Sequence, residues 1–220
     1  MAFCLDIKGD YACFTRPEMK VERVSYDVIT PSSARSIFES ILWKPAIFWQ
    51  ITKIEVLNPI CWMNIRRNEV SSVIPAKNVQ TAMKNGKGNL GLIVEENRQQ
   101  RAGLILKDVH YRIHGKFLMT EKAGPRDNPG KFAEMFTHRA KKGQCINQPF
   151  LGCREFACSF ELCDETSSVI EPINEDRDFG YMLYDMDFSD PKNPQPMFFR
   201  AKMQKGIINV PERNSGEVIA

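Results

Sequence analysis

A helix that runs directly into a strand is the clearest feature of this sequence, and it lies between Thr30 and Pro59. Thr30 is a favourable N-cap, and Pro31 suits the first helical position because its missing N–H needs no partner there. Apolar residues then recur at helical spacing until Pro45. After Pro45, apolar and polar residues alternate, which predicts a half-buried strand that ends at Asn58-Pro59. We expect the rest of the fold to be built around this helix–strand unit.

The composition is that of an ordinary globular protein. With 220 residues, the chain is long enough to bury a sizeable core, as one large domain or one and a half. Hydrophobic residues make up 43% and charged residues 26%, which argues against a disordered or fibrous chain. No apolar run approaches the length of a membrane span, so we expect no membrane partner.

The cysteines indicate a reducing compartment. Seven cysteines occur without a C-x-x-C pair, and no signal peptide is recognised after Met1. We therefore expect a reduced protein in the cytoplasm. Cys153, Cys158 and Cys163 are spaced by five residues, which on a strand would turn the middle thiol to the opposite face. Packed thiols are therefore expected rather than a metal site.

The charges are distributed unevenly along the chain. Cations predominate from Arg101 to Lys142, whereas acidic residues predominate from Glu161 to Asp190. This distribution favours a polyanion such as a nucleic acid on one face of the molecule. The alternative is that these charges are solvated and have no binding role.

Further elements follow from the same kind of pattern. The expected segments are a strand Phe3–Phe14 interrupted or turned at Gly9-Asp10, a loop or mobile hairpin over 71–100, strands over 102–120, a helix from Asn128-Pro129 to Gly143, strands Arg154–Cys163 and Tyr181–Phe188, and a hairpin Met197–Val210 with its turn at Lys205-Gly206. The first part of the chain therefore has the β-α-β-β-α-β order of elements that is typical of a ferredoxin-like or RNA-recognition (RRM-like) fold. The sequence therefore predicts an α+β protein with a ferredoxin-like domain over 1–150 and an appended antiparallel β region over 151–220.

The candidates for chemistry are two groups of basic residues and the histidines. The basic loop Lys141–Gln144, continuing to Gly152-Cys153-Arg154, suits close approach of a phosphate backbone. Arg66 and Arg67, with Trp62 close by, suit single-stranded RNA, although surface arginines beside a core tryptophan would look the same.

The histidines are few. His110 and His114 share a strand face but lack a third ligand, so no metal site is expected. His138 follows Lys131 by seven residues on about the same helical face, where a solvated surface is the simpler interpretation. Sequence motifs for nucleotide, hydrolase or metalloprotease sites are absent, so no cofactor is expected.

Several long segments together resemble one known family. They are SYDVITPSSARSIFESILWKPAIFWQITKIEVLNP, NIRRNEV, LILKDVHYRI, NPGKFAEMFTHRAKKGQCINQPFLGCREF, YMLYDMDF and FFRAKMQKGIINVP. In this order they resemble the subtype I-C CRISPR-associated RAMP proteins, the small fifth-family subunit of that system's Cascade complex. The resemblance implies a protein that binds CRISPR repeat RNA, cuts the precursor without a metal and remains on the 5′ handle of the guide RNA.

The same resemblance implies partners and an RNA surface. The partners are the backbone and large subunits of Cascade and, through that complex, target DNA. An insertion around 64–101 corresponds to the family's thumb over the 5′ handle. The residues expected to contact RNA are Trp43, Lys44, Arg66, Arg67, Arg101, Lys116, Lys141, Lys142 and Arg154.

The family's catalytic pattern is only partly present. It implies a tyrosine before the W-K-P string and an adjacent lysine and histidine after the N-x-G string. Here Lys131 is retained, whereas the tyrosine position is Leu42 and the histidine position is Phe132. Neither replacement can transfer protons, and loss of a general acid or base typically costs about 10²- to 10⁴-fold in rate. Three alternatives remain open: His138, His114 or Tyr26 substitutes, Lys131 supports slow cutting, or the protein only holds RNA.

Overall fold

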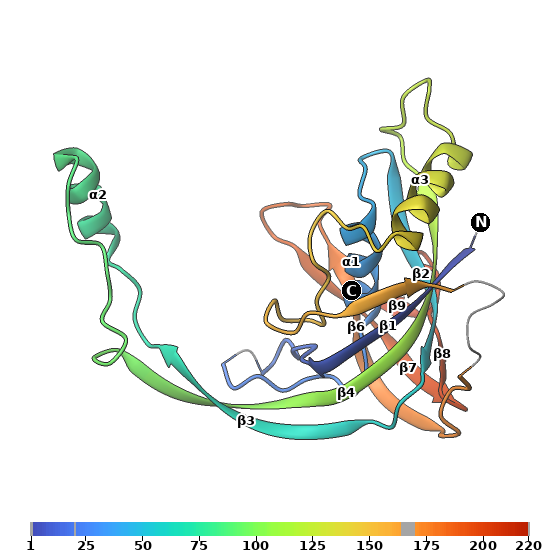
Figure 1. Cartoon of the computed structure of the whole chain (residues 1–220), viewed down its shortest axis with the longest axis horizontal. Coiled ribbons are helices and arrows are strands. Elements are labelled where there is room, and N and C mark those ends of the chain that lie inside the picture. The colour runs from blue at the N-terminus through green and yellow to red at the C-terminus, as the bar shows by residue number, and fades with distance from the viewer. Residues whose placement is uncertain (1, 20, 164–169, 220) are drawn as a thin grey trace.

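The fold is a mixed α/β arrangement around one mostly antiparallel sheet (Figure 1). The computed structural model describes residues 2–19, 21–163 and 170–219. The strands are β1 (Ala2–Ala12), β2 (Ile47–Val56), β3 (Cys61–Val70), β4 (Arg98–Met119), β5 (Ser159–Leu162), β6 (Arg177–Asp187), β7 (Gln195–Gln204), β8 (Ile207–Asn209) and β9 (Val218–Ile219). The helices are α1 (Pro31–Ile41), α2 (Ala76–Asn85) and α3 (Pro129–Lys141). The strand order is β5-β1-β4-β2-β8-β7-β6, with β3 paired to β4 and β9 paired to β7.

Local capping sets the starts of α1 and α3. The Thr30 hydroxyl accepts a hydrogen bond from the Ser33 backbone N–H at 3.3 Å, and the Asn128 side chain accepts one from Lys131 at 2.9 Å. A proline occupies the first turn in both helices. Helix α1 ends because Leu42 is extended, with φ −145°. The predicted helix starts and the bounds predicted for β2 are therefore confirmed.

An aromatic cluster joins α1 and α3 to one face of the sheet. The Trp49 ring of β2 lies 4.8 Å from Phe38 of α1 and 4.7 Å from Phe136 of α3 between ring centroids. Its indole N–H donates to the Leu42 carbonyl oxygen at 2.8 Å, so the buried polar atom is satisfied. This contact fixes the turn between α1 and β2 on the protein core.

The opposite face of the central sheet carries paired charges. The Glu55 carboxylate lies 2.6 Å from Arg112 and 2.9 Å from His114, and Asp6 lies 2.8 Å from His110. The pKa of Glu55 is lowered, because its hydrogen bonds with Lys53 and Arg112 outweigh the opposing effect of burial, which is the largest single influence. Most of the charge on this face is therefore neutralised within the protein.

Two strand predictions are wrong. Strand β1 continues through Gly9 without a turn, since Gly9 pairs with Val109 and a side chain there would collide with Leu151. The expected strand Arg154–Cys163 is a strand only at β5, because Leu151 and Phe156 close a turn through an N–H to carbonyl bond of 2.8 Å. The hairpin turn at Lys205-Gly206 is confirmed, with positive φ at both residues.

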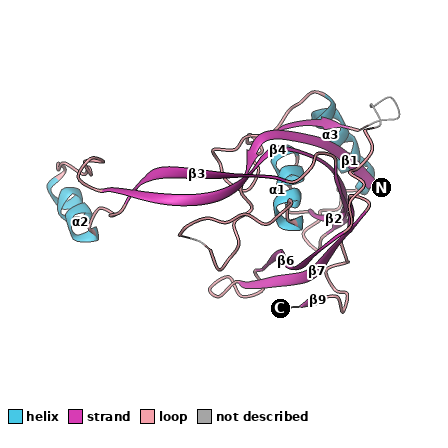
Figure 2. Cartoon of the chain, turned by 90° about the horizontal axis from the view of Figure 1, so that it is seen from below, coloured by secondary structure: helices cyan, strands magenta, loops and turns pink. Residues whose placement is uncertain are grey.

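A long arm projects from the sheet (Figure 2). It consists of β3 and the first half of β4, which pair from Cys61↔Lys107 to Val70↔Arg98, with α2 beyond them. No residue of α2 is buried. The region 71–100 was expected as a loop or mobile hairpin. It contains instead a helix, α2, that does not pack against the core. Residues 164–169 of the acidic segment lie outside the described residues.

Substitution of Gly152 tests the contact between the loop after α3 and Cys13, the residue that follows β1. Gly152 has φ +82°, and a Cβ there would collide with the Cys13 carbonyl group. We expect Gly152→Ala to lower the free energy of unfolding by about 3 kcal/mol or more, because backbone must move as well as adopt a strained φ. Gly143→Ala is the matched control, with φ +62° and open space around it, and should cost about 1 kcal/mol. Urea unfolding measures both, and equal losses would contradict this packing.

Candidate functional site

A basic cleft lies between the α1–β2 turn and the first turn of α3. It has a volume of about 260 Å³ and is lined by Lys44, Pro45, Ala46, Lys122, Asp127, Lys131, Phe132 and Met135. Three lysines and one aspartate give the lining two net positive charges. The N-terminal end of α3 adds the partial positive charge of its free N–H groups. The cleft therefore favours an anionic group such as a phosphate.

Lys131 is held in this cleft by the chain just before it. Its ammonium donates to Asp127 Oδ1 at 2.9 Å, and Asp127 Oδ2 accepts the Gly124 N–H at 3.0 Å. The hydrogen bond from Lys131, followed by that from Gly124, lowers the pKa of the Asp127 carboxyl group. Asp127 therefore stays ionised in neutral solution and orients the lysine toward the cleft.

The two other positions implied by the family resemblance lie in the core. Leu42 is fully buried, and Phe132 is 2% exposed with its ring edge-on to Phe117 at 6.4 Å. The Lys131 ammonium lies 5.5 Å from the centre of the Phe132 ring. Among the described residues that line the cleft there is no tyrosine or histidine. The cleft therefore supplies cations but no phenol or imidazole that could act as a general base.

The three residues considered as replacements for the missing catalytic groups, His138, His114 and Tyr26, do not lie beside Lys131. His138 is exposed on α3 and lines a neighbouring hollow with Arg139 and Gln144, which shares only Met135 with the lining of the cleft among the described residues. Seven residues of helix separate it from Lys131, which is about 10 Å of rise. His114 is bonded to Glu55 on the opposite face of the sheet. Tyr26 is 2% exposed, with the Arg16 guanidinium 4.5 Å above its ring.

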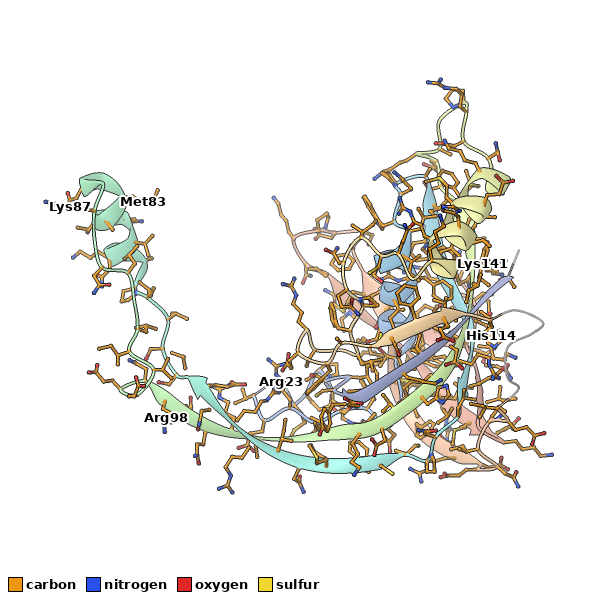
Figure 3. All side chains as sticks on the ribbon, in the orientation of Figure 1. Arg23, Met83, Lys87, Arg98, His114 and Lys141 are labelled. Atoms are coloured by element: carbon orange, nitrogen blue, oxygen red, sulfur yellow. The ribbon has the colours of Figure 1, made fainter. Side chains whose placement is uncertain are left out.

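Four of the predicted RNA contacts lie near this cleft or at the far end of α3. Trp43 and Lys44 follow the buried Leu42 and are both exposed. Lys141 and Lys142 are exposed at the end of α3, where Figure 3 labels Lys141. Arg139 anchors this end of the helix by donating to the Ile41 carbonyl oxygen at 3.0 Å.

The arm carries three further predicted contacts. Arg67 and Arg101 are cross-strand neighbours, and Arg66 beside them is exposed. Arg67 forms an ion pair with Glu155, which follows the exposed Arg154. The arm is therefore tied at this point to the loop after α3. Figure 3 shows Arg98 much further along the arm.

Lys116 is separated from the other candidates. It lies on the paired-charge face, where its ammonium is 2.8 Å from Glu212. Lys122 and Asp127, by contrast, line the basic cleft although neither is among the site residues predicted from the sequence. They belong to no motif, and only the fold brings them beside Lys44 and Lys131.

The cysteines are all free thiols among the described residues. Cys153 and Cys158 are buried, as expected for packed thiols. A hydrogen bond with Cys13, reinforced by Arg23 at 3.1 Å, lowers the pKa of Cys153 to about 6. Within the part of the chain that the structure describes, no three potential metal ligands cluster, and no helix is long and apolar enough to cross a membrane.

Comparison with known structures supports the fold. A solved structure described as a CRISPR-associated protein superposes with a TM-score of 0.71, covering 100% of this chain and 97% of its own at 20% identity. A protein from Streptococcus mutans superposes with a TM-score of 0.69, again covering 100% and 97%, at 21% identity. At these identities the similarity concerns the fold alone.

Comparison of sequences identifies the family. A protein of Mannheimia succiniciproducens named CRISPR pre-crRNA endoribonuclease Cas5d is 50% identical over 219 residues, covering 97% of this chain and 96% of its own. A protein of Thermus thermophilus with the same name is 36% identical, covering 96% and 91%. The family model Cas_Cas5d, described as CRISPR-associated protein (Cas_Cas5), matches residues 2–211. The chain therefore belongs to the Cas5d family of CRISPR-associated proteins, which confirms the resemblance noted in its sequence.

Proposed function

We propose that this protein binds precursor CRISPR RNA and cuts it without a metal, with the Lys131 cleft as the site of cutting. The observation that carries this proposal is the cleft itself, in which the retained Lys131 lies beside two further lysines. Near end-to-end similarity to two proteins named CRISPR pre-crRNA endoribonuclease supports the same function.

The chemistry would be an intramolecular transesterification of RNA. The ribose 2′-oxygen attacks the adjacent phosphorus, the bond from phosphorus to the 5′ oxygen breaks, and the products carry a cyclic phosphate and a 5′ hydroxyl. Lys131, with Lys44 and Lys122, would stabilise the charge that develops on the phosphorane. A lysine ammonium would also protonate the leaving 5′ oxygen. Because the cleft offers no phenol or imidazole, the 2′ proton passes to solvent water, and we therefore expect slow cutting.

A ferredoxin-like N-terminal unit is part of this proposal. The order β5-β1-β4-β2, antiparallel throughout, with α1 and α3 as the connecting helices, supports it. The arm then forms the family's thumb, inserted between the second and third core strands. Since β5 would be the fourth core strand, this unit extends to Leu162, beyond the predicted boundary at residue 150.

The competing function is that of an RNA-capping subunit that does not cut. The burial of two apolar residues at Leu42 and Phe132 favours it, because proton transfer is then missing at both positions. In either case we infer that the protein stays on the 5′ handle and joins the backbone and large subunits of a cytoplasmic Cascade complex, which in turn engages target DNA.

Cleavage of its own repeat RNA in excess EDTA tests the enzyme. We expect one cut, at the base of the repeat hairpin, because no step requires a metal. Lys131→Gln should slow it by about 10²-fold, since a cation that stabilises the transition state is lost. The matched control is Lys202→Gln, an exposed lysine of β7, which should leave the rate unchanged. Intact RNA under conditions where binding is demonstrated would favour the capping function instead.

Phe132→His tests the missing proton-transfer group. Phe132 lines the cleft next to Lys131, so an imidazole there could accept the 2′ proton. We expect the cleavage rate at pH 7 to rise by at least about tenfold and to fall at lower pH, where the imidazole becomes protonated and can no longer accept the 2′ proton. Phe188→His, at an exposed aromatic residue, serves as the control. A folded Phe132→His variant with an unchanged rate would show that this position is not part of the site.

Arg66→Ala tests the arm. If Arg66 contacts a phosphate, its loss should weaken RNA binding and reduce the slope of log K against log salt by about 0.7. Fluorescence anisotropy across a salt series measures this slope. Arg200→Ala, an exposed arginine on β7, is the comparison. The same slope in wild type and Arg66→Ala would remove Arg66 from the interface.

A further inference from the structure

Two adjoining hollows lie near the basic cleft, since Trp43 lines the first of them and its neighbour Lys44 lines the cleft. The first, of about 250 Å³, is lined by the α1 residues Ser36, Glu39 and Ser40, by Trp43, and by Asn147, Gln148, Pro149 and Phe150 of the loop after α3. The second, of about 390 Å³, is lined by Asn147, Gln148, Phe150 and Arg154. Because three residues of the loop line both hollows, the two form one continuous surface next to Lys44.

The walls of these hollows are held in place by the fold. Gln148 donates from Nε2 to the Cys158 carbonyl oxygen at 3.0 Å. The Ile146 N–H donates to the Ser40 carbonyl oxygen at 2.7 Å, and Phe150 forms an isolated bridge with Ala157. On the other side, the bond between Trp49 and the Leu42 carbonyl fixes the backbone just before Trp43. The surface is therefore preorganised for a ligand.

The first hollow presents a flat ring and hydrogen-bond acceptors. Trp43 is 57% exposed, and its N–H has no partner among the described residues. Glu39 is held by Arg35 through one carboxylate oxygen, which leaves the other oxygen without a described partner. The Gln148 amide oxygen and the Asn147 side chain also lack a bond to any described residue.

The charges of the two hollows differ. No lysine or arginine is among the described residues that line the first, and its carboxylate would repel a phosphate. Arg154, in the second, forms no ion pair with a described residue and could contact one. The first hollow thus suits an uncharged ring with an N–H donor, and the second suits the phosphate attached to it.

We propose that the hollow beside Trp43 binds one unpaired base of the RNA that carries an exocyclic amino group. The base stacks on the Trp43 indole, its amino group donates to Glu39 and to the amide oxygens, and Arg154 contacts its phosphate. This inference rests on the proposed function as an RNA-binding protein and adds a specificity-determining pocket next to the lysine cleft.

Hexaadenylate and a hexamer of purine riboside are matched probes for this pocket, since unsubstituted purine lacks the exocyclic amino group and gains no N–H donor in its place. We expect wild type to bind hexaadenylate about fivefold or more tightly than the purine riboside hexamer. Trp43→Ala should weaken binding of hexaadenylate by about tenfold. Glu39→Gln, which keeps an oxygen for Arg35, should abolish the preference between the two probes. Tyr181→Ala, at an aromatic residue that is 60% exposed, should change neither affinity.

Fluorescence gives a second readout that does not depend on the alanine variant folding. Stacking of hexaadenylate should quench indole emission in wild type, and Trp43→Phe should remove that quenching while retaining most of the affinity. Equal binding of both probes by wild type, or quenching that survives in Trp43→Phe, would overturn the pocket. If wild type cleaves or binds repeat RNA in those cases, only the pocket fails. If it binds no RNA of any kind, the proposed function fails as well.

Discussion

The structure depends on one strand that belongs to two parts of the molecule. Strand β4 extends over 22 residues, and its second half lies between β1 and β2 in the centre of the sheet. Its first half leaves the sheet and pairs with β3 to form the arm. Because backbone hydrogen bonds run along the whole strand, the arm projects from the sheet in a direction that the core strands set.

The two faces of the central sheet differ in their side chains, which are charged on one face and aromatic on the other. On one face, acidic and basic side chains such as Glu55 and Arg112 pair with each other, which leaves little net field. On the other face, an aromatic cluster around Trp49 fastens both helices to the sheet. At the edge of that helical layer, Lys44, Lys122 and Lys131 gather around a single carboxylate. We therefore propose that RNA binds on the helical side.

Local chemistry explains what the sequence could predict. The capping residues Thr30 and Asn128 act within three residues, so the helix starts are readable without the fold. The cleft is different, because Lys44 and Lys122 are far apart in the chain and only the strand order brings them together. The continuity of β1 through Gly9 also depends on a distant residue, because Gly9 pairs with Val109 of β4. The replacements at the catalytic positions, Leu42 and Phe132, could be recognised only by comparison with the family's pattern.

Lysine footprinting tests the central claim that RNA binds at the basic cleft on the helical side. The protein is acetylated briefly with and without its repeat RNA, and each lysine is quantified by mass spectrometry. We expect RNA to protect Lys44, Lys122 and Lys131, while Lys202 and Lys205 react equally in both samples. Protection of Lys202 and Lys205 with undiminished reactivity of the three cleft lysines would contradict it.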